Sequence, residues 1–239
     1  MIEPHKNQEF LFSNEARSLR ILGEYIYPKT VLEKQNIQDA IVIFGSARIH
    51  PDAKEGEQVY PLTKYYTETV KVAGLLTKWA KSISKTEVQD RLVICTGGGP
   101  GIMEAGNRGA REAGGRSIAL NIRLPAEQES NPYVDNSLSF TFHYFFMRKL
   151  WFMQVARALI VMPGGFGTMD ELFEILTLIQ TQKSTRVPVV LYGKEFWHKL
   201  INFPLLVEYG LISKEDLELF HFSDSPEDTL EHLQKNIPL

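Results

Sequence analysis

Short runs of apolar residues alternate with amphipathic stretches along most of this chain, and this pattern predicts alternating strands and helices. Residues 40–44 and 158–161 are apolar throughout. Such continuous apolar strands are typical of a parallel sheet that is covered on both faces. We expect strands at Ala40–Phe44, Leu92–Thr96, Ser117–Leu120, Ser139–Phe142, Ala158–Val161, Val187–Tyr192 and, as a short last strand, Leu219–Phe222.

The stretches between these strands predict helices. The helices that we expect lie at Pro61–Ser82, Gly101–Ala113, Phe145–Ala156, Thr168–Gln180 and Glu195–Glu208, followed by a last helix that Ser225 caps and Pro226 begins. A further helix precedes the first strand. It covers Ser13–Asn36, with Ser13 as its N-cap and an apolar stripe that includes Leu19, Leu22 and Ile26.

This order of elements predicts one doubly wound α/β domain over residues 39–239, with a parallel sheet and helices on both faces. Residues 1–38 form an N-terminal helical extension in this interpretation. It could cover a face of the sheet or extend a subunit interface. We find no internal repeat, low-complexity segment or change of composition that would mark a linker. In such sheets, ligands bind beyond the carboxyl ends of the strands.

The net charge of −3 disfavours a surface whose main role is nucleic-acid binding. Cys95 is the single cysteine, so an internal disulfide and a multi-cysteine metal site are excluded. Residues 1–10 do not read as a signal peptide, and no run approaches the roughly 18 apolar residues of a membrane span. We therefore expect a cytoplasmic protein that does not cross a membrane.

Residues 162–171 carry the most informative pattern, because a strand runs there into a glycine-rich turn that opens a helix. Bare backbone N–H groups and the helix dipole favour an anion such as a phosphate at this place. Asp170 and Glu171 would lie beside it. A capping box, in which Thr168 caps the helix and Glu171 bonds back to it, explains the two side chains equally well. It does not explain Gly164, Gly165 and Gly167.

Two other turns follow predicted strands. Residues 97–101 hold four glycines before a helix, and tight packing explains only one or two of them, so ligand contact is favoured. Residues 44–48 contain Gly45, Ser46 and Arg48. Ser46 and Arg48 could donate hydrogen bonds to a ligand, or the segment could be a plain surface turn. The glycine-rich turns match neither the G-x-G-x-x-G fingerprint nor a P-loop, which favours a ligand smaller than a dinucleotide.

Arg148 and Lys149 form a cation pair among aromatic residues at the start of an expected helix. They could contact the ligand, or one of them could reach solvent beside a packed aromatic face.

Taken together, three segments resemble the LOG ("Lonely Guy") family of phosphoribohydrolases, namely Gly97–Glu104, Arg148-Lys149 and Pro163–Glu171. Members release the base from nucleoside 5′-monophosphates, including cytokinin riboside monophosphates, and were long labelled "possible lysine decarboxylase". The likeness covers roughly residues 40–210. Its most specific part is the string P-G-G-x-G-T-x-x-E together with the upstream R-K.

The resemblance implies a Rossmann-like fold, a homodimer or higher homo-oligomer, and no cofactor or metal. It also implies that Arg148 and Glu171 are the catalytic pair and that Gly164–Thr168 hold the 5′-phosphate. The full set of substrate-binding residues that we expect is Ser46, Gly98, Gly99, Met147, Lys149, Gly164, Gly165, Gly167, Thr168, Asp170 and Glu174.

One departure from the family concerns the base. Shorter cytokinin-activating members often carry Thr-Trp after the second acid of this helix, whereas this chain has Thr177-Leu178. We therefore expect a nucleoside 5′-monophosphate N-glycosidase that acts on AMP or on a cytokinin riboside monophosphate. The alternatives are a non-enzymatic nucleotide carrier or sensor and, less favoured, a lysine decarboxylase that uses pyridoxal phosphate.

Overall fold

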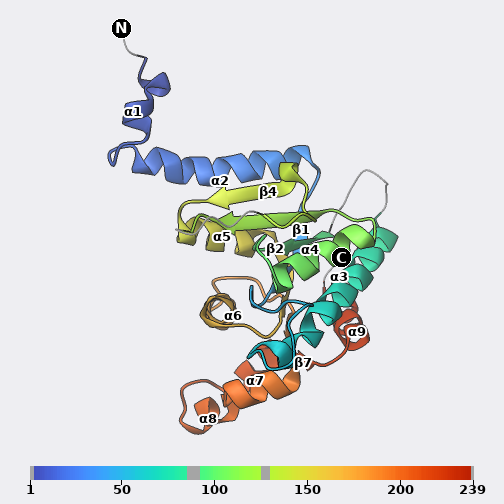
Figure 1. Cartoon of the computed structure of the whole chain (residues 1–239). Coiled ribbons are helices and arrows are strands. Elements are labelled where there is room, and N and C mark those ends of the chain that lie inside the picture. The colour runs from blue at the N-terminus through green and yellow to red at the C-terminus, as the bar shows by residue number, and fades with distance from the viewer. Residues whose placement is uncertain (1–2, 85–91, 125–129, 238–239) are drawn as a thin grey trace.

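The centre of the protein is a parallel sheet (Figure 1). The computed structural model describes residues 3–84, 92–124 and 130–237, and within them the seven strands follow the order β4-β3-β2-β1-β5-β6-β7. All neighbouring strands are parallel. Their bounds are β1 Asp39–Phe44, β2 Leu92–Thr96, β3 Ser117–Ile122, β4 Ser139–Phe142, β5 Ala156–Val161, β6 Val189–Tyr192 and β7 His221–Ser223.

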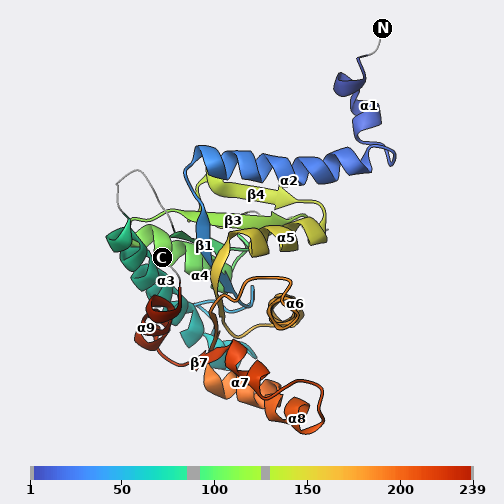
Figure 2. The ribbon, with the colours of Figure 1, turned by 180° about the vertical axis from the view of Figure 1, so that it is seen from behind.

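Helices cover both faces of this sheet, as the two opposite views show (Figures 1 and 2). Helices α3, α4 and α9 pack on one face, and α2, α5, α6, α7 and α8 contribute to the core on the other. The α-helices are α1 Gln8–Leu11, α2 Arg17–Lys34, α3 Lys64–Ile83, α4 Ile102–Glu112, α5 Phe145–Val155, α6 Phe166–Gln180, α7 Lys194–Leu200, α8 Phe203–Glu208 and α9 Pro226–Asn236. Short 3-10 helices lie at η1 Pro4–Lys6, η2 Tyr60–Leu62, η3 Asn136–Leu138 and η4 Glu215–Leu219.

Strand β1 shows why its sequence is apolar without alternation. Ile41 and Ile43 belong to the core beneath α3 and α4, whereas Val42 and Phe44 belong to the core on the opposite face. Successive side chains of a strand point to opposite faces, so a strand that is covered twice needs apolar residues at every position. The doubly wound α/β fold predicted from the sequence is thereby confirmed.

The strand order reverses between β1 and β5. The chain runs outward from β1 through β2 and β3 to β4, then returns to pair β5 with β1 before adding β6 and β7. At such a switch point the loops that follow the two central strands diverge, which leaves a crevice for a ligand.

Two predictions of helix bounds are wrong. The helix expected over Glu195–Glu208 is divided into α7 and α8, because Asn202 caps a new helix through the N–H of Leu205 and Pro204 occupies its first turn. Ser13 is not the N-cap of the long N-terminal helix, because α2 begins only at Arg17. The carbonyl of Ser13 instead accepts a hydrogen bond from Arg20.

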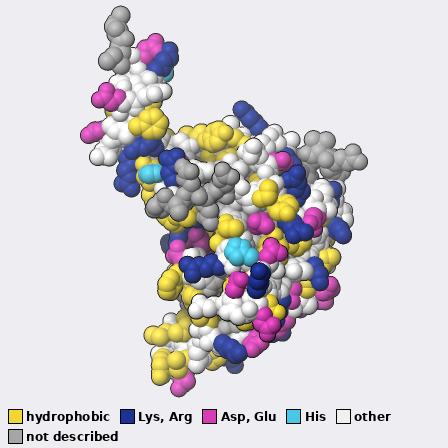
Figure 3. All heavy atoms as spheres, in the orientation of Figure 1, with side chains coloured by type: hydrophobic (Ala, Val, Ile, Leu, Met, Phe, Trp, Pro, Cys, Tyr) yellow, Lys and Arg dark blue, Asp and Glu magenta, His cyan; other side chains and the backbone are white. Residues whose placement is uncertain are grey.

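Hydrogen bonds connect helix α2 to α5 and to the residues before it. The carboxylate of Glu24 accepts hydrogen bonds from the backbone N–H groups of His143 and Tyr144, and its carbonyl accepts one from the indole of Trp151. The stripe expected on this helix lies on the outer side instead. Leu19, Leu22 and Ile26 are about half exposed (51%, 53% and 50%), and hydrophobic side chains gather on the surface over α2 in Figure 3.

We predict opposite effects for two glycine-to-alanine substitutions in helices. At Gly109, where α4 crosses α3, an added Cβ would lie 2.3 Å from the carbonyl oxygen of Val70. Gly109→Ala should therefore lower the free energy of unfolding by about 1–3 kcal/mol, because the two helices must separate. At Gly23 in α2 an added Cβ meets no atom within 4 Å. Gly23→Ala should stabilise the protein by about 0.4–1 kcal/mol.

Urea denaturation of both variants and the wild type measures these changes. Equal stability of Gly109→Ala and the wild type would contradict the close packing of α3 against α4.

Candidate active site

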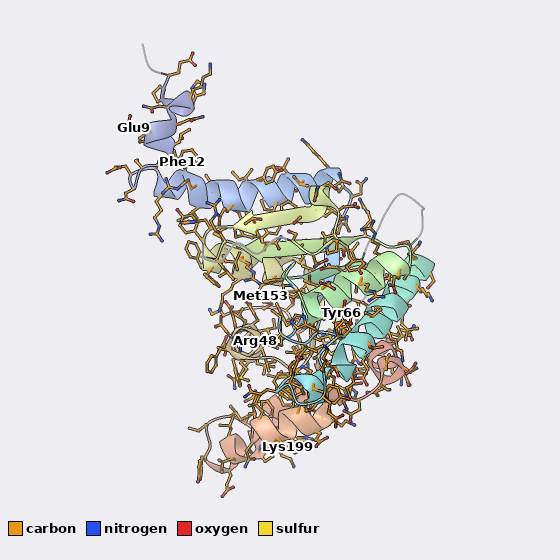
Figure 4. The ribbon with its side chains drawn as sticks, in the orientation of Figure 1. Glu9, Phe12, Arg48, Tyr66, Met153 and Lys199 are labelled. Atoms are coloured by element: carbon orange, nitrogen blue, oxygen red, sulfur yellow. The ribbon has the colours of Figure 1, made fainter. Side chains whose placement is uncertain are left out.

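A cavity of about 590 Å³ opens at the carboxyl ends of β1, β2 and β5. It lies at the switch point of the sheet, and its volume is typical of a small-molecule site. Arg48, from the loop after β1, lies beside α6 in Figure 4. The lining consists of residues 44–48, Gly97, Met103, Phe145, Arg148 and residues 165–171.

The loop after β1 is held between the other two loops by backbone hydrogen bonds. The N–H of Ser46 donates to the carbonyl of Pro163 at 3.1 Å, and the N–H of Ile102 donates to the carbonyl of Ser46 at 3.1 Å. Gly45 makes this close approach possible, because a Cβ there would lie 2.4 Å from Cγ2 of Ile102. The three glycine-containing turns expected from the sequence therefore form one connected wall.

Helix α6 begins at Phe166, with Gly165 at the N-cap position and no side-chain cap. Thr168 consequently lies inside the first turn, so the alternative of a capping box formed by Thr168 and Glu171 is wrong. The glycines explain why α6 begins at Phe166, before the predicted start at Thr168. A Cβ at Gly164 would lie 2.1 Å from Oγ1 of Thr168, so the backbone can close over this threonine only without a side chain.

The N-terminus of α6 is open toward the cavity. Gly165, Phe166 and Gly167 are exposed, and an added Cβ at either glycine meets no atom within 4 Å. The first N–H groups of a helix have no partner within the helix and carry part of its positive dipole. An anionic group of a ligand can therefore reach backbone donors here.

Glu171 follows in the next turn of α6 and lines the same cavity. Burial raises the pKa of its carboxyl group to about 7, although the nearby charges of Arg148 and Lys149 act in the opposite direction. A carboxyl group with a pKa near neutrality can both accept and release a proton under physiological conditions. The geometry thus places an acid–base group beside a helix N-terminus.

Arg148 of α5 lines the cavity and is half-buried, so it is the member of the cation pair that a ligand can contact. Its guanidinium lies 5.2 Å from the ring centroid of Phe152. Its Nε is buried and has no hydrogen-bond partner in the part of the chain that the structure describes. A Cβ at Gly97 would lie 2.6 Å from Nη2 of Arg148. Burial lowers the pKa of the guanidinium while Glu171 raises it, and an arginine remains charged under these influences.

Lys149 connects α5 to α6 beside the cavity. Its Nζ lies 2.8 Å from Oδ2 of Asp170 and 3.0 Å from Oε2 of Glu174. Burial alone would lower the pKa of this amine, but the two carboxylates outweigh it and raise the pKa. The lysine is therefore held as a protonated partner of two acids.

The structure brings only part of the predicted set to the cavity surface. Ser46, Gly165, Gly167, Thr168 and Asp170 line it together with Arg148 and Glu171. The other predicted residues are not part of the lining. Gly98 and Gly99 are buried, and Met147 belongs to the hydrophobic core. Gly164 packs on Thr168, while Lys149 and Glu174 form the ion pair described above.

Several lining residues were not predicted as site residues, and aromatic side chains are the clearest case. Phe145 is 54% exposed and Phe166 is 93% exposed at the cavity mouth. The sequence predicts Phe145 within a helix, whereas Phe166 lies in the glycine-rich turn that the LOG resemblance assigns to the 5′-phosphate. The position of Phe166 between two glycines of the turn was the available signal, because such a residue cannot belong to a packed helix face. Met103 and Met169 also line the cavity and were not predicted, whereas Arg48 lines it as one of the possible donors expected from the sequence.

We predict that the pKa of Glu171 rises above 7 in Arg148→Gln, because the arginine charge is the largest influence that lowers it. Carboxyl ¹³C NMR from about pH 5 to about pH 9 follows this titration. Arg157→Gln is the control, since Arg157 pairs with Asp39 at 2.7 Å and does not line the cavity. A wild-type Glu171 that titrates at its ordinary value would contradict the buried environment described here.

Comparison with known proteins gives a family and a fold. A family model described as "possible lysine decarboxylase" matches residues 103–233, more than half of the chain. The pyrimidine/purine nucleotide 5′-monophosphate nucleosidase of Escherichia coli K12 is 27% identical over 161 residues. The match covers 62% of this chain and 35% of that enzyme, so the chain corresponds to about a third of the relative's length.

Among solved structures, the structural genomics target TM1055 is 19% identical, with a TM-score of 0.56 over 82% of this chain and 99% of that one. The molybdenum cofactor binding protein of Rippkaea orientalis is 19% identical, with a TM-score of 0.52 over 84% and 96%. The Moco carrier protein of Chlamydomonas reinhardtii is 17% identical, with a TM-score of 0.53 over 83% and 96%. At these identities the likeness shows a shared fold.

No helix within the described residues is long and apolar enough to cross a membrane. With the matched region covering most of the Rossmann-like sheet and its cavity, the chain belongs to the LOG family, the group whose family model is described as "possible lysine decarboxylase".

Proposed function

We propose that the protein hydrolyses the N-glycosidic bond of nucleoside 5′-monophosphates, releasing the free base and ribose 5-phosphate with water as co-substrate. The observation that carries this proposal is the position of Glu171, with a pKa of about 7, in the same cavity as the uncapped N-terminus of α6. A phosphate at that helix end leaves the ribose within the cavity, beside the carboxyl group.

The 5′-phosphate binds at the first turn of α6 in this proposal. Backbone N–H groups of Gly165–Thr168 donate to its oxygens, and the dipole of a helix that runs from Phe166 to Gln180 favours its negative charge. The two exposed glycines keep side chains out of the approach. Ser46 and Arg48, on the opposite wall, are further donors.

Arg148 orients the ribose. Its guanidinium is a planar fork of donors, and no group within the described residues accepts the hydrogen of its buried Nε. A buried donor without a partner is costly unless a ligand supplies the acceptor. The ribose hydroxyls are acceptors of the required kind.

Glu171 acts on the bond that breaks. Cleavage of an N-glycosidic bond develops oxocarbenium character on the ribose, and a nearby carboxylate stabilises that charge. The carboxylate also accepts a proton from the attacking water, whose oxygen forms the new bond to C1′. The base departs with the electron pair of the broken bond and takes up a proton.

The base lies toward the aromatic mouth of the cavity, beside Phe145 and Phe166. Ring stacking accepts purines and pyrimidines alike, because every base has a π face. AMP and cytokinin riboside monophosphates are both substrates to be tested, and Leu178, where cytokinin-activating members often carry Trp, gives no reason to prefer the cytokinin.

We predict that Glu171→Gln retains nucleotide binding but lowers kcat by roughly 10²- to 10⁴-fold, because the amide cannot accept the proton of water. A panel of nucleoside monophosphates, assayed for free base and for ribose 5-phosphate, measures the loss. Glu208→Gln, an exposed acid at the end of α8, is the matched control and should leave turnover unchanged. Undiminished cleavage by Glu171→Gln would exclude the mechanism.

The pKa of Glu171 also predicts the pH profile. The reactive form is the carboxylate, so kcat/KM should fall about tenfold per pH unit below about pH 7 and level off above it. The second ionisation of the substrate phosphate, near pH 6, contributes at the acidic end. Binding to Glu171→Gln over the same pH range isolates that contribution. A flat profile between about pH 6 and pH 8 would contradict the role of this group.

A nucleotide carrier or sensor on the same fold is the second candidate. This fold also occurs in the molybdenum cofactor binding protein of Rippkaea orientalis and in the Moco carrier protein of Chlamydomonas reinhardtii. Wild-type protein that binds monophosphates without releasing base would favour it.

The decarboxylase label fits the residues less well. Lysine decarboxylation normally uses pyridoxal phosphate as a Schiff base on a lysine, which must be able to lose its proton. Lys149 is the lysine closest to the site, and its ion pairs with Asp170 and Glu174 raise its pKa. Addition of pyridoxal phosphate should therefore produce no Schiff-base absorbance band.

The cytoplasmic location expected from the sequence, and the homo-oligomeric assembly that the LOG resemblance implies, belong to the same proposal. Light scattering of the purified protein tests the assembly.

A further inference from the structure

Behind the glycine turn of residues 97–101 lies a buried group of polar side chains that the proposed mechanism does not use. The group is Thr96, Asn107, Ser117 and Asn131, with exposed fractions of 0%, 0%, 4% and 6%. Buried polar groups are costly unless they are fully hydrogen-bonded, so such a group has either a structural or a functional reason.

These side chains form a closed ring of hydrogen bonds around Gly98. The N–H of Gly98 donates to Oγ1 of Thr96 at 3.0 Å, and that hydroxyl donates to Oδ1 of Asn107 at 2.7 Å. Nδ2 of Asn131 donates to the same Oδ1 at 2.9 Å and to the carbonyl of Gly98 at 3.1 Å. Nδ2 of Asn107 donates to Oγ of Ser117 at 2.9 Å, which fixes the orientation of its amide.

Asn131 provides most of the contacts between this ring and the turn. Its Nδ2 also reaches the carbonyl of Gly99 at 3.2 Å, and its backbone N–H donates to the carbonyl of Gly98 at 2.9 Å. Its Oδ1 accepts from the N–H of Tyr133 at 3.2 Å, so the amide is oriented with its nitrogen toward the turn. One side chain, distant in sequence, thus holds two consecutive peptide units.

The opposite side of the turn supports Arg148. Gly97 precedes the restrained Gly98, whose φ of +74° is in the left-handed region. Gly97 lines the cavity, and a Cβ there would meet Nη2 of Arg148 at 2.6 Å. A shift of the peptide between residues 97 and 98 therefore moves the surface on which the guanidinium rests.

We propose that Asn131 is a positioning residue, which acts through Gly98 and Gly97 to fix the guanidinium of Arg148 for its contact with the ribose of the substrate. This inference rests on the proposed function, since it assigns Arg148 to the substrate. It adds a residue from outside the cavity lining and from outside the motifs that carry the family resemblance.

The test compares Asn131→Ala and Asn131→Asp with Ser130→Ala. Aspartate keeps the shape of the side chain but directs an acceptor at the carbonyls of Gly98 and Gly99. Ser130 is the matched control, because it is exposed and, among the described residues, its hydroxyl contacts Oγ of Ser139 at 3.0 Å. Circular dichroism and thermal denaturation establish that each variant is folded before ligand is added.

Two readouts separate positioning from simple loss of stability. The first is coupling with Arg148: Asn131→Ala should lower kcat/KM for AMP about 10- to 100-fold, but less than about twofold further in an Arg148→Ala background. The second needs no ligand. The Nε–Hε NMR signal of Arg148, assigned by its absence in Arg148→Lys, should shift in both Asn131 variants and stay in place in Ser130→Ala.

Additive losses of kcat/KM, or an unmoved Arg148 signal in a folded Asn131 variant, would overturn the positioning role. Failure of the proposed function gives a different result. If the wild type binds AMP without releasing ribose 5-phosphate, the same coupling is measured on the dissociation constant. If it binds no monophosphate, the NMR shift alone decides whether Asn131 positions Arg148.

Discussion

The site depends on the burial of two opposite charges, Arg148 and Glu171, beside glycine residues whose backbone carries no side chain. Removal from water raises the pKa of Glu171 to about 7, and the arginine limits this rise. Gly97 lets the guanidinium lie against the turn, and the open N-terminus of α6 supplies positive dipole nearby. A buried charge is unfavourable alone, and together these features make a cavity suited to an anionic ligand.

The topology of the sheet brings these groups together. Because β5 pairs directly with β1, the loops after these strands meet, and the bonds from Ser46 to Pro163 and from Ile102 to Ser46 lock them to the loop after β2. Arg148 arrives from α5, the helix that leads into β5, whereas Glu171 arrives from α6, the helix that follows it. Two successive crossover helices, one on each side of β5 in the chain, therefore deliver these side chains to one edge of the sheet.

The sequence predicts the strands well because both faces of the sheet are covered. A strand that is buried on both faces has an unbroken run of apolar residues, which is visible in the sequence. The sequence predicts less well where a helix begins or ends when several local signals compete. Thr168 and Glu171 satisfy the spacing of a capping box, yet the neighbouring glycines allow α6 to start before Thr168. Pro204 and Asn202 divide a helix that the apolar pattern leaves continuous. The role of Asn131 has no local signal at all, since its partners lie more than twenty residues earlier in the chain.

The protein belongs to the LOG family and has a Rossmann-like fold. The central claim of the proposed function is that α6 binds the phosphate while Glu171 faces the anomeric carbon. The most direct measurement is a crystal structure with ribose 5-phosphate, the expected product. The account predicts phosphate oxygens within hydrogen-bond distance of the backbone N–H groups at Gly165–Thr168, with C1 of the sugar next to the Glu171 carboxylate. A phosphate bound elsewhere, or a sugar that points away from Glu171, would contradict it.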